Sequence, residues 1–282
     1  MQGARWLASV LALGLAALAL SNRSGGAEPP RAATSAALAS LDAGIDADAA
    51  PVPTHPPVTP PNFELVDAGK DRPIRVLPAA RPGRRVLVYL HGYCGDVNAV
   101  GAFVPAAAEY GTLIALLGDQ PCKDKPGRFK WDTDPHALDQ RIQRAIRLVN
   151  RTQKLELDAH DVTLFGYSQG AVRAESLARY YGKRYPRVIL GGPPRRPKPE
   201  HFKQVRTVAV FGGELEDTTD MLGGADDLIA AGFHAQFFLL PDVDHGDFGG
   251  ELAGNQALTT ILDFMSSPAP PPERSEPTRV AR

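Results

Sequence analysis

The feature that most constrains this chain is the run Gly166-Tyr167-Ser168-Gln169-Gly170, which has the form G-x-S-x-G. Residues 161–165 before it are a short β-branched and aromatic segment typical of a buried strand. Residues 171–181 after it contain no Gly or Pro and favour a helix. Small residues at both ends let a strand and a helix approach closely around a strained, exposed serine. The pattern therefore predicts a nucleophilic Ser168, and the alternative is a glycine-rich turn with a surface serine.

The N-terminus predicts an exported protein. Residues 1–27 contain Arg5, then an apolar run over 6–20, then small and polar residues, as in a secretory signal peptide. This run is shorter than the about 20 residues that a membrane-spanning helix needs, so we expect no stable membrane insertion after cleavage. An uncleaved N-terminal anchor is the alternative. The expected location is secreted or periplasmic.

The expected folded domain lies between two segments of biased composition. Residues 28–61 are Ala, Pro, Ser, Thr and Asp with almost no large apolar side chain, which predicts a disordered linker. The tail over 266–282 has five prolines among charges and the same character. Residues 62–265 remain as one substantial domain. The net charge of −1 gives no indication of a nucleic-acid partner, which would require a basic face.

The two cysteines, Cys94 and Cys122, predict a disulfide, because an even pair in an exported protein is most simply bridged. Each follows a predicted strand, so both could lie at the same edge of a sheet. Two unpaired thiols are the alternative.

Apolar strands alternate with helical patterns along the domain. Strands are predicted over 74–77, 85–90, 113–117, 161–165, 187–190, 205–211 and 233–240. Helices are predicted over 97–110, from Asp134-Pro135 to about 149, over 171–181, within 218–231 and over 256–265, with an irregular stretch over 118–134. This alternation predicts an α/β fold, a doubly wound and mostly parallel sheet with helices on both faces. Its chemistry should gather in the loops at the carboxyl ends of the strands.

A histidine and an acid are available in those loops to activate the serine. His245 follows the last predicted strand and is the expected base, whereas His201 and His234 are less well placed. For the acid that orients it, Glu216 ranks first and Asp217 second. Asp242 and Asp244, in the loop of the histidine itself, stay open as further alternatives.

The tetrahedral intermediate of such chemistry needs preoriented N–H donors. The backbone N–H of Gln169 at the start of a helix is one candidate, and that of Tyr93, in the turn after the first long strand, is the second. His91 is expected to organise that turn. No H-x-x-H or clustered His/Asp/Glu spacing predicts a metal site.

These motifs together resemble the α/β-hydrolase superfamily over most of residues 75–265. The resemblance rests on His91-Gly92-Tyr93-Cys94-Gly95-Asp96, Gly166-Tyr167-Ser168-Gln169-Gly170 and Asp244-His245-Gly246. The Ser-Gln-Gly element is similar to phospholipase/carboxylesterase and polyhydroxyalkanoate-depolymerase-like esterases. One departure is the acid loop, which has Glu216-Asp217 where a single Asp is usual.

The resemblance implies a serine hydrolase that cleaves small-molecule or polymeric carboxylic esters through an acyl-enzyme, without a cofactor. The superfamily usually inserts its lid where this chain has only the short, proline-rich stretch 191–204, so a minimal lid or none is expected. Tyr167 and Trp131 are expected to contact substrate, although Trp131 could equally be ordinary packing. A peptidase or polyester depolymerase, and an inactive hydrolase fold used for binding, are the alternatives. The acyl and alcohol groups and the oligomeric state are not predicted.

Overall fold

The structure is a computed structural model, and it describes residues 62–95, 97–246 and 250–268. The predicted signal peptide, the predicted linker and all but the first residues of the predicted C-terminal tail lie outside these ranges.

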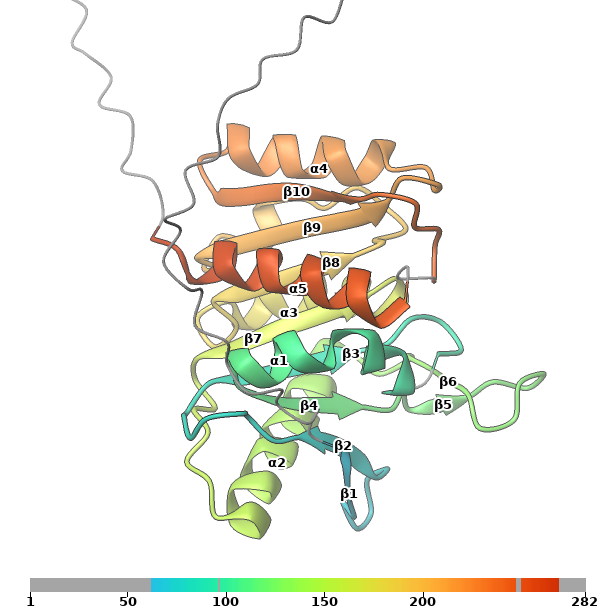
Figure 1. The fold of residues 1–282 in the computed structure, drawn as a ribbon, viewed down its shortest axis with the longest axis vertical. Coiled ribbons are helices and arrows are strands. Elements are labelled where there is room, and N and C mark those ends of the chain that lie inside the picture. Colours follow the sequence, from blue (N-terminus) through green and yellow to red (C-terminus); the bar gives the residue numbers. More distant parts are fainter. Residues whose placement is uncertain (1–61, 96, 247–249, 269–282) are drawn as a thin grey trace, which may run out of the picture. The chain divides into compact units, whose positions relative to one another are not determined.

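Eight strands form one sheet, shown in Figure 1. The order across the sheet is β1-β2-β4-β3-β7-β8-β9-β10. β1 pairs antiparallel with β2, and β2 antiparallel with β4, whereas all pairs from β4 to β10 are parallel. The strands are β1 (Glu64–Val66), β2 (Ile74–Leu77), β3 (Val86–Leu90), β4 (Thr112–Leu116), β7 (Val162–Tyr167), β8 (Arg187–Gly191), β9 (Thr207–Gly213) and β10 (His234–Leu240).

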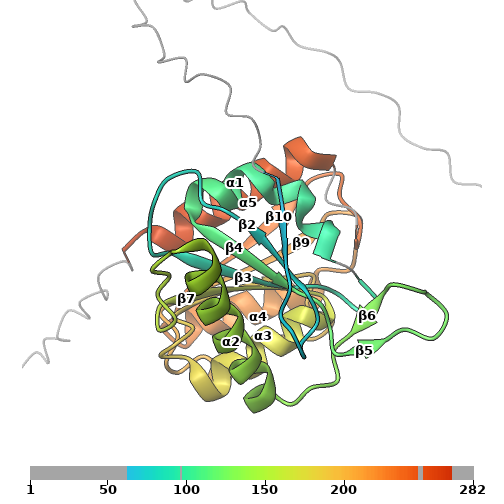
Figure 2. The ribbon, with the colours of Figure 1, turned by 90° about the horizontal axis from the view of Figure 1, so that it is seen from below.

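Helices cover both faces of this sheet, as Figure 2 shows. One face carries the 3-10 helix η1 (Val97–Phe103), α1 (Val104–Tyr110) and α5 (Gly250–Ser266). The other face carries α2 (Pro135–Gln153), α3 (Gln169–Tyr181) and α4 (Thr219–Ala230). The predicted doubly wound α/β architecture is confirmed.

The apolar strands are continuous because both of their faces are buried. In β3, Val88 and Leu90 pack with the core under α2 and α3, while Leu87 and Tyr89 pack with the core under α1 and α5. All of these side chains are fully buried. A strand between two helical layers must be apolar on both sides, which explains the lack of a polar alternation in its sequence.

Several elements differ from the predictions. The edge strand β1 was not predicted, and the stretch 118–134, expected to be irregular, contains the short antiparallel pair β5 (Gln120–Pro121) and β6 (Phe129–Lys130). The helix predicted over 97–110 begins as a 3-10 helix and becomes α-helical only at Val104, next to Pro105. The last helix begins at 250 instead of 256. Between β8 and β9 lies only the 3-10 helix η2 (Pro199–His201), in agreement with the expected absence of a lid domain.

The parallel strands end at one edge of the sheet, which we call the carboxyl edge. It lies on the right in Figure 1, where the arrowheads point. The loops after β3, β7, β9 and β10 therefore meet there, and they carry the predicted site residues. Among the described residues, no helix has the length and apolar character needed to cross a bilayer.

Candidate active site

Ser168 lies at the sharp turn between β7 and α3. Its backbone has φ 52° and ψ −115°, a conformation that is strained for a residue with a side chain. The N–H of Ser168 donates to the carbonyl of Gly191 at 2.8 Å, which anchors the turn to the neighbouring strand. A β-carbon at Gly170 would overlap the carbonyl oxygen of Leu90. Glycine at this position is thus what allows the helix to start so close to the sheet.

His245 reaches the serine from the loop after β10. Its Nε2 lies 3.1 Å from Oγ of Ser168, across 77 positions of sequence. The ring edge between its two nitrogens is close to Gly192, where a β-carbon would lie 2.9 Å from Cε1 of His245. Gly192 also has φ 49°, a backbone conformation that favours glycine. A larger residue there would therefore both clash with the ring and strain the backbone.

Glu216 contacts the other nitrogen of the imidazole. Its Oε2 lies 2.6 Å from Nδ1 of His245, and its Oε1 accepts the N–H of Gly213 at 2.8 Å. The side chain of Glu216 is only 10% exposed. Because a carboxylate accepts hydrogen bonds, this contact fixes the proton on Nδ1 and leaves the Nε2 lone pair facing the serine hydroxyl.

The other candidate acids have different partners. The Asp217 carboxylate accepts the N–H of Thr219 at the start of α4, and the hydrogen bonds from Thr219 lower the pKa of Asp217. Asp244 accepts the backbone N–H of His245 at 2.6 Å rather than an imidazole N–H. Of the four predicted carboxylates, the structure brings only Glu216 to the ring of His245 among the described residues.

The other two histidines lie away from the serine. His201 Nδ1 is 2.8 Å from Glu175 Oε1, and the ring of His234 packs against Phe264 with 4.4 Å between centroids. Burial lowers the pKa of His234.

Tyr167, which was expected to contact substrate, is mostly buried beside the site. It is 7% exposed, its hydroxyl oxygen accepts the N–H of Gly246 at 2.8 Å, and its ring lies 5.3 Å from that of His245. Burial raises the pKa of Tyr167 to about 12, so the phenol is neutral at physiological pH. Tyr167 therefore holds the loop that carries His245 through a hydrogen bond and a ring contact.

Of the two predicted oxyanion donors, Gln169 directly follows the serine, and Tyr93 lies in a turn that passes close to it. Gln169 is the first residue of α3, so its N–H precedes the intrahelical hydrogen bonds and lies at the positive end of the helix dipole. Tyr93 follows Gly92, where a β-carbon would lie 3.2 Å from Cβ of Ser168. The turn after β3 is thus in contact with the serine.

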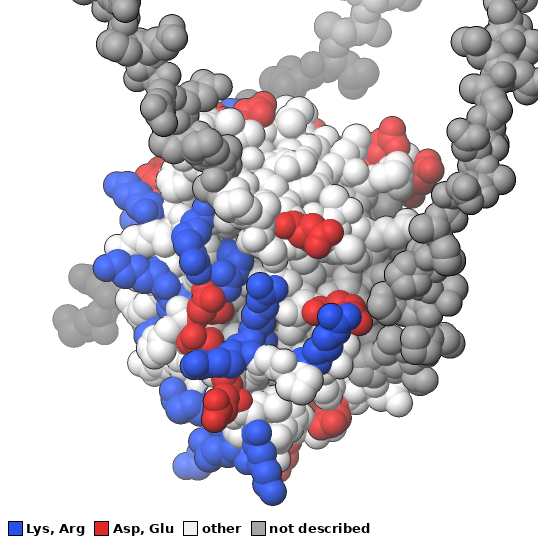
Figure 3. Space-filling model, turned by 60° about the vertical axis from the view of Figure 1, so that its left-hand side comes forward, with Lys and Arg blue, Asp and Glu red and all other residues white. Residues whose placement is uncertain are grey.

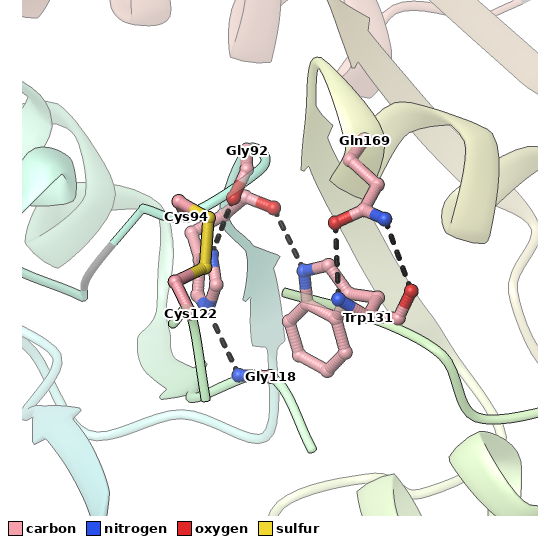
Figure 4. The surroundings of a disulfide bond; sticks show 7 residues. Gly92, Cys94, Gly118, Cys122, Trp131 and Gln169 are labelled. Atoms are coloured by element: carbon pink, nitrogen blue, oxygen red, sulfur yellow. Dashed lines mark hydrogen bonds between the residues drawn. A yellow bond between two sulfur atoms is a disulfide. The ribbon is translucent and has the colours of Figure 1, made fainter. Parts of the chain in front are cut away.

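A disulfide and a buried histidine organise that turn, and Figure 4 shows the disulfide between Cys94 and Cys122 close to Gly92 and Gly118. Cys94 and Cys122 are bonded, with their Cα atoms 5.8 Å apart, as predicted. His91 is fully buried, with its Nδ1 2.7 Å from the carbonyl of Gly92, and its Nε2 accepts the N–H of Gly118 at 2.8 Å. His91 therefore has the structural place that was expected, joining the turn after β3 to the loop after β4.

The same network continues to the residue after the serine (Figure 4). Trp131 donates its indole N–H to the carbonyl of His91 at 2.8 Å. The amide side chain of Gln169 then pairs with both backbone groups of Trp131, each at 3.0 Å. Trp131 is 1% exposed, so the structure places it in the packing that was the alternative to a substrate wall. This Gln169–Trp131 pair was not foreseen from the sequence.

Comparison with known proteins supports the fold. No family model and no curated protein sequence matches the chain. Among solved structures, TT1662 from Thermus thermophilus is similar with a TM-score of 0.53 at 16% identity, over 73% of this chain and 99% of that protein. A mutant of the esterase E40 gives 0.52 at 17% identity, over 75% and 86%. FphF, a fluorophosphonate-binding serine hydrolase of Staphylococcus aureus, gives 0.53 at 14% identity, over 73% and 99%.

The chain has the α/β-hydrolase fold. In an α/β-hydrolase, the serine, the acid and the histidine follow in this order along the chain, and Ser168, Glu216 and His245 do so here. Within the described residues, no group of three or more His, Cys, Asp or Glu side chains could hold a metal ion.

Proposed function

We propose that this protein is an exported serine hydrolase that cleaves carboxylic esters through an acyl-enzyme on Ser168. The observation that carries the proposal is the continuous chain of hydrogen bonds from Glu216 through His245 to Ser168. The esterase and serine hydrolase names of the structural neighbours support the ester class.

In the first half of the reaction, Oγ of Ser168 attacks the ester carbonyl carbon while its proton passes to Nε2 of His245. The imidazolium is stabilised by Glu216, which keeps its charge. The oxygen of the tetrahedral intermediate accepts hydrogen bonds from the N–H groups of Gln169 and Tyr93. Nε2 then gives its proton to the leaving alkoxide, the carbon–oxygen bond breaks, and the alcohol departs.

In the second half, a water molecule gives a proton to Nε2 and its oxygen attacks the acyl carbon. The second tetrahedral intermediate collapses, Oγ of Ser168 leaves with the proton from Nε2, and the carboxylic acid is released. The strained turn at Ser168 keeps Oγ at the open end of β7 throughout both halves.

Export is proposed from two independent features. The predicted signal peptide over 1–27 is one, and the disulfide is the other, because disulfides persist in oxidising compartments.

The test is labelling with a fluorophosphonate probe followed by peptide mapping. The probe should modify Ser168, and Ser168→Ala should lose both the label and p-nitrophenyl acetate hydrolysis. Modification of another residue would contradict the proposal. Absence of both label and turnover in a folded preparation would favour a binding protein with an inactive hydrolase fold.

A second experiment with the same preparation distinguishes an esterase from a peptidase or a polyester depolymerase. Initial rates on p-nitrophenyl esters of increasing acyl length, on peptide amides and on polyester film should be highest for the short esters. A higher rate on peptides or on polymer would replace the ester assignment with a peptidase or a depolymerase.

A further inference from the structure

A second concave site lies at the carboxyl edge, separate from the serine. A cavity of about 630 Å³ lies between the segment before β2, the loop after β4 and the start of α2. Its charged lining residues are Lys70, Asp71, Arg72, Asp119, Arg141 and Arg144. None of these residues takes part in the hydrogen-bond chain of the candidate active site.

The walls of this cavity carry more positive than negative charge. Four side chains are cationic (Lys70, Arg72, Arg141 and Arg144) and two are acidic (Asp71 and Asp119). Asp71 already pairs with Arg144, at 3.0 Å. The lining therefore has an excess of two positive charges, which repel one another unless an anion lies between them.

The carboxylate of Asp119 is also committed elsewhere. Its Oδ1 accepts the N–H groups of Asp132 and Thr133, at 2.9 and 3.1 Å. Burial acts to raise the pKa of Asp119, but the hydrogen bonds from Thr133 and Asp132 outweigh it and hold that pKa below its usual value. Asp119 thus stays ionised while it orients the loop, and it forms no ion pair with the cations among the described residues.

Arg141 is the unusual member of the lining. It is 7% exposed, and its Nη1 donates to the carbonyl of Leu117 at 2.6 Å. Its Nη2 is buried and has no hydrogen-bond partner within the described part of the chain. Burial lowers the pKa of Arg141 and outweighs the attraction of Asp71 and Asp119, which acts to raise it. A buried guanidinium with an unused donor is costly, since a charged group away from water requires a partner.

We propose that this cavity is a binding site for an oxyanion of the phosphate or sulfate class, either free or attached to a larger molecule. Guanidinium groups match the geometry of such oxygens, and a doubly charged oxyanion balances the excess charge of the lining. Arg72, whose Nη2 donates to the carbonyl of Asp119 at 3.1 Å and whose guanidinium stacks 4.2 Å from the Phe129 ring, is held in place at the rim. The cavity is larger than one oxyanion, so it also leaves room for an attached group.

The test is a thermal-unfolding titration of the full mature chain at pH 7 and constant ionic strength. Sodium chloride is replaced stepwise by sodium phosphate or sodium sulfate. A ligand that binds only the folded state at 100 times its dissociation constant raises the Tm of a domain of this size by about 5–10 °C. A saturable rise with phosphate or sulfate supports the site. A Tm that is the same in chloride, phosphate and sulfate overturns it.

Substitutions of the lining residues test whether they form the phosphate site. Arg72→Gln and Lys70→Gln should each weaken phosphate binding about tenfold or more, and Arg141→Met should abolish it. Arg147→Gln is the matched control, because Arg147 is an exposed arginine of the same helix that does not line the cavity. If Arg141→Met fails to fold, the phosphate affinities of the Arg72 and Lys70 variants still test the site. Equal affinities of Arg72→Gln, Lys70→Gln and Arg147→Gln would overturn the assignment.

Calorimetric titrations with inorganic phosphate and with glycerol 3-phosphate distinguish a free oxyanion from one attached to a larger molecule. Both should bind. Tighter binding of the ester indicates that the natural ligand carries its phosphate on a larger molecule, and equal binding indicates the free ion. Failure of both, with fluorophosphonate labelling of Ser168 intact, would reject this site and leave the proposed hydrolase function standing.

Discussion

At the scale of single residues, Glu216 is suited to its place by the length of its side chain. Its backbone N–H donates to the carbonyl of Gly213 at 3.3 Å, and its Oε1 accepts the N–H of the same glycine at 2.8 Å. The side chain thus folds back over its own turn and still reaches Nδ1 of His245 with the other oxygen. An aspartate is one methylene shorter and could not make both contacts from this backbone.

We therefore predict that Glu216→Gln lowers kcat for p-nitrophenyl acetate by about 10²–10⁴-fold, because an amide no longer fixes the tautomer or stabilises the imidazolium. Steady-state kinetics would measure it. Asp217→Asn is the matched control and should keep kcat near that of the unmodified protein, since Asp217 contacts only the start of α4. An equal loss in both variants would contradict the assignment of the acid.

Tyr167 gives a prediction about stability at high pH. Its pKa is raised to about 12 in the folded protein, against about 10 in an unfolded chain. The folded state therefore keeps a proton that the unfolded state loses. This contribution is fully present below pH 10 and is lost as the pH rises towards 12.

Two pKa units correspond to about 2.7 kcal/mol. Tyr167→Phe lacks this contribution, so its free energy of unfolding should decline less between pH 9.5 and 11.5 than that of the unmodified protein. Urea unfolding at a series of pH values would measure both curves. Parallel curves for the two proteins would show that Tyr167 is not responsible.

At the scale of elements, the contact between β7 and α3 decides whether the serine turn can form. A β-carbon at Gly170 would overlap the carbonyl oxygen of Leu90, an atom of the backbone that cannot move without displacing β3. Gly101 in η1 offers the comparison, because nothing lies within 4 Å of a β-carbon there.

Gly170→Ala should destabilise the fold by about 3 kcal/mol, the upper end of what overpacking typically costs. For a domain of this size the Tm should fall by about 6–12 °C. Gly101→Ala should leave the Tm almost unchanged, and differential scanning calorimetry would compare the two. A Gly170→Ala protein as stable as the Gly101→Ala protein would show that strand and helix separate more easily than their packing indicates.

The disulfide joins two loops of the carboxyl edge across 28 positions of sequence. Closing a loop of this length contributes about 2–4 kcal/mol by restricting the unfolded chain. The bridge also holds the turn that carries His91 and Tyr93, so its loss should affect turnover as well as stability.

We predict that reduction lowers the free energy of unfolding by this amount and lowers kcat/KM at temperatures well below the Tm. Urea unfolding and ester hydrolysis with and without a phosphine reductant would measure both. The double variant Cys94→Ser/Cys122→Ser is the control and should not respond to the reductant. An unchanged kcat/KM after verified reduction would show that the disulfide is not needed for catalysis.

At the scale of the whole domain, the sequence predicted those parts of the structure that follow from burial. The sheet was predictable because strands such as β3 are apolar at every position, which only a strand between two layers requires. β1 was not, because its three residues are mostly exposed at a sheet edge and carry no periodicity. The burial of Tyr167 and Trp131 could not be predicted for another reason. An aromatic residue near a reactive group has the same sequence signature whether it faces substrate or core.

Charge is distributed unevenly over the domain, which the net value of −1 conceals. From Thr207 to Pro268 there is no Lys or Arg, but there are eleven Asp and Glu residues. The basic residues therefore belong to the part of the domain before β9. Figure 3, which turns the N-terminal ends of the strands towards the viewer, shows blue side chains gathered over one side of the surface, with red ones interleaved among them. Arg85, Arg187 and Arg206 line a cavity of about 390 Å³ at this end, with Asp161 as the acidic residue among them.

This asymmetry predicts that the protein binds a sulfonate cation exchanger at pH 7.5 and low salt despite its negative net charge, because a local field attracts a polyanion within about one Debye length. Retention should be lost as salt shortens that length. The double variant Arg85→Gln/Arg206→Gln should elute at lower salt than the unmodified protein. Lys123→Gln/Lys125→Gln removes the same charge from exposed positions between β5 and β6 at the opposite edge, and should change elution less. Equal shifts for the two double variants would show that retention depends on total charge alone, and the basic end would then have no special part in it.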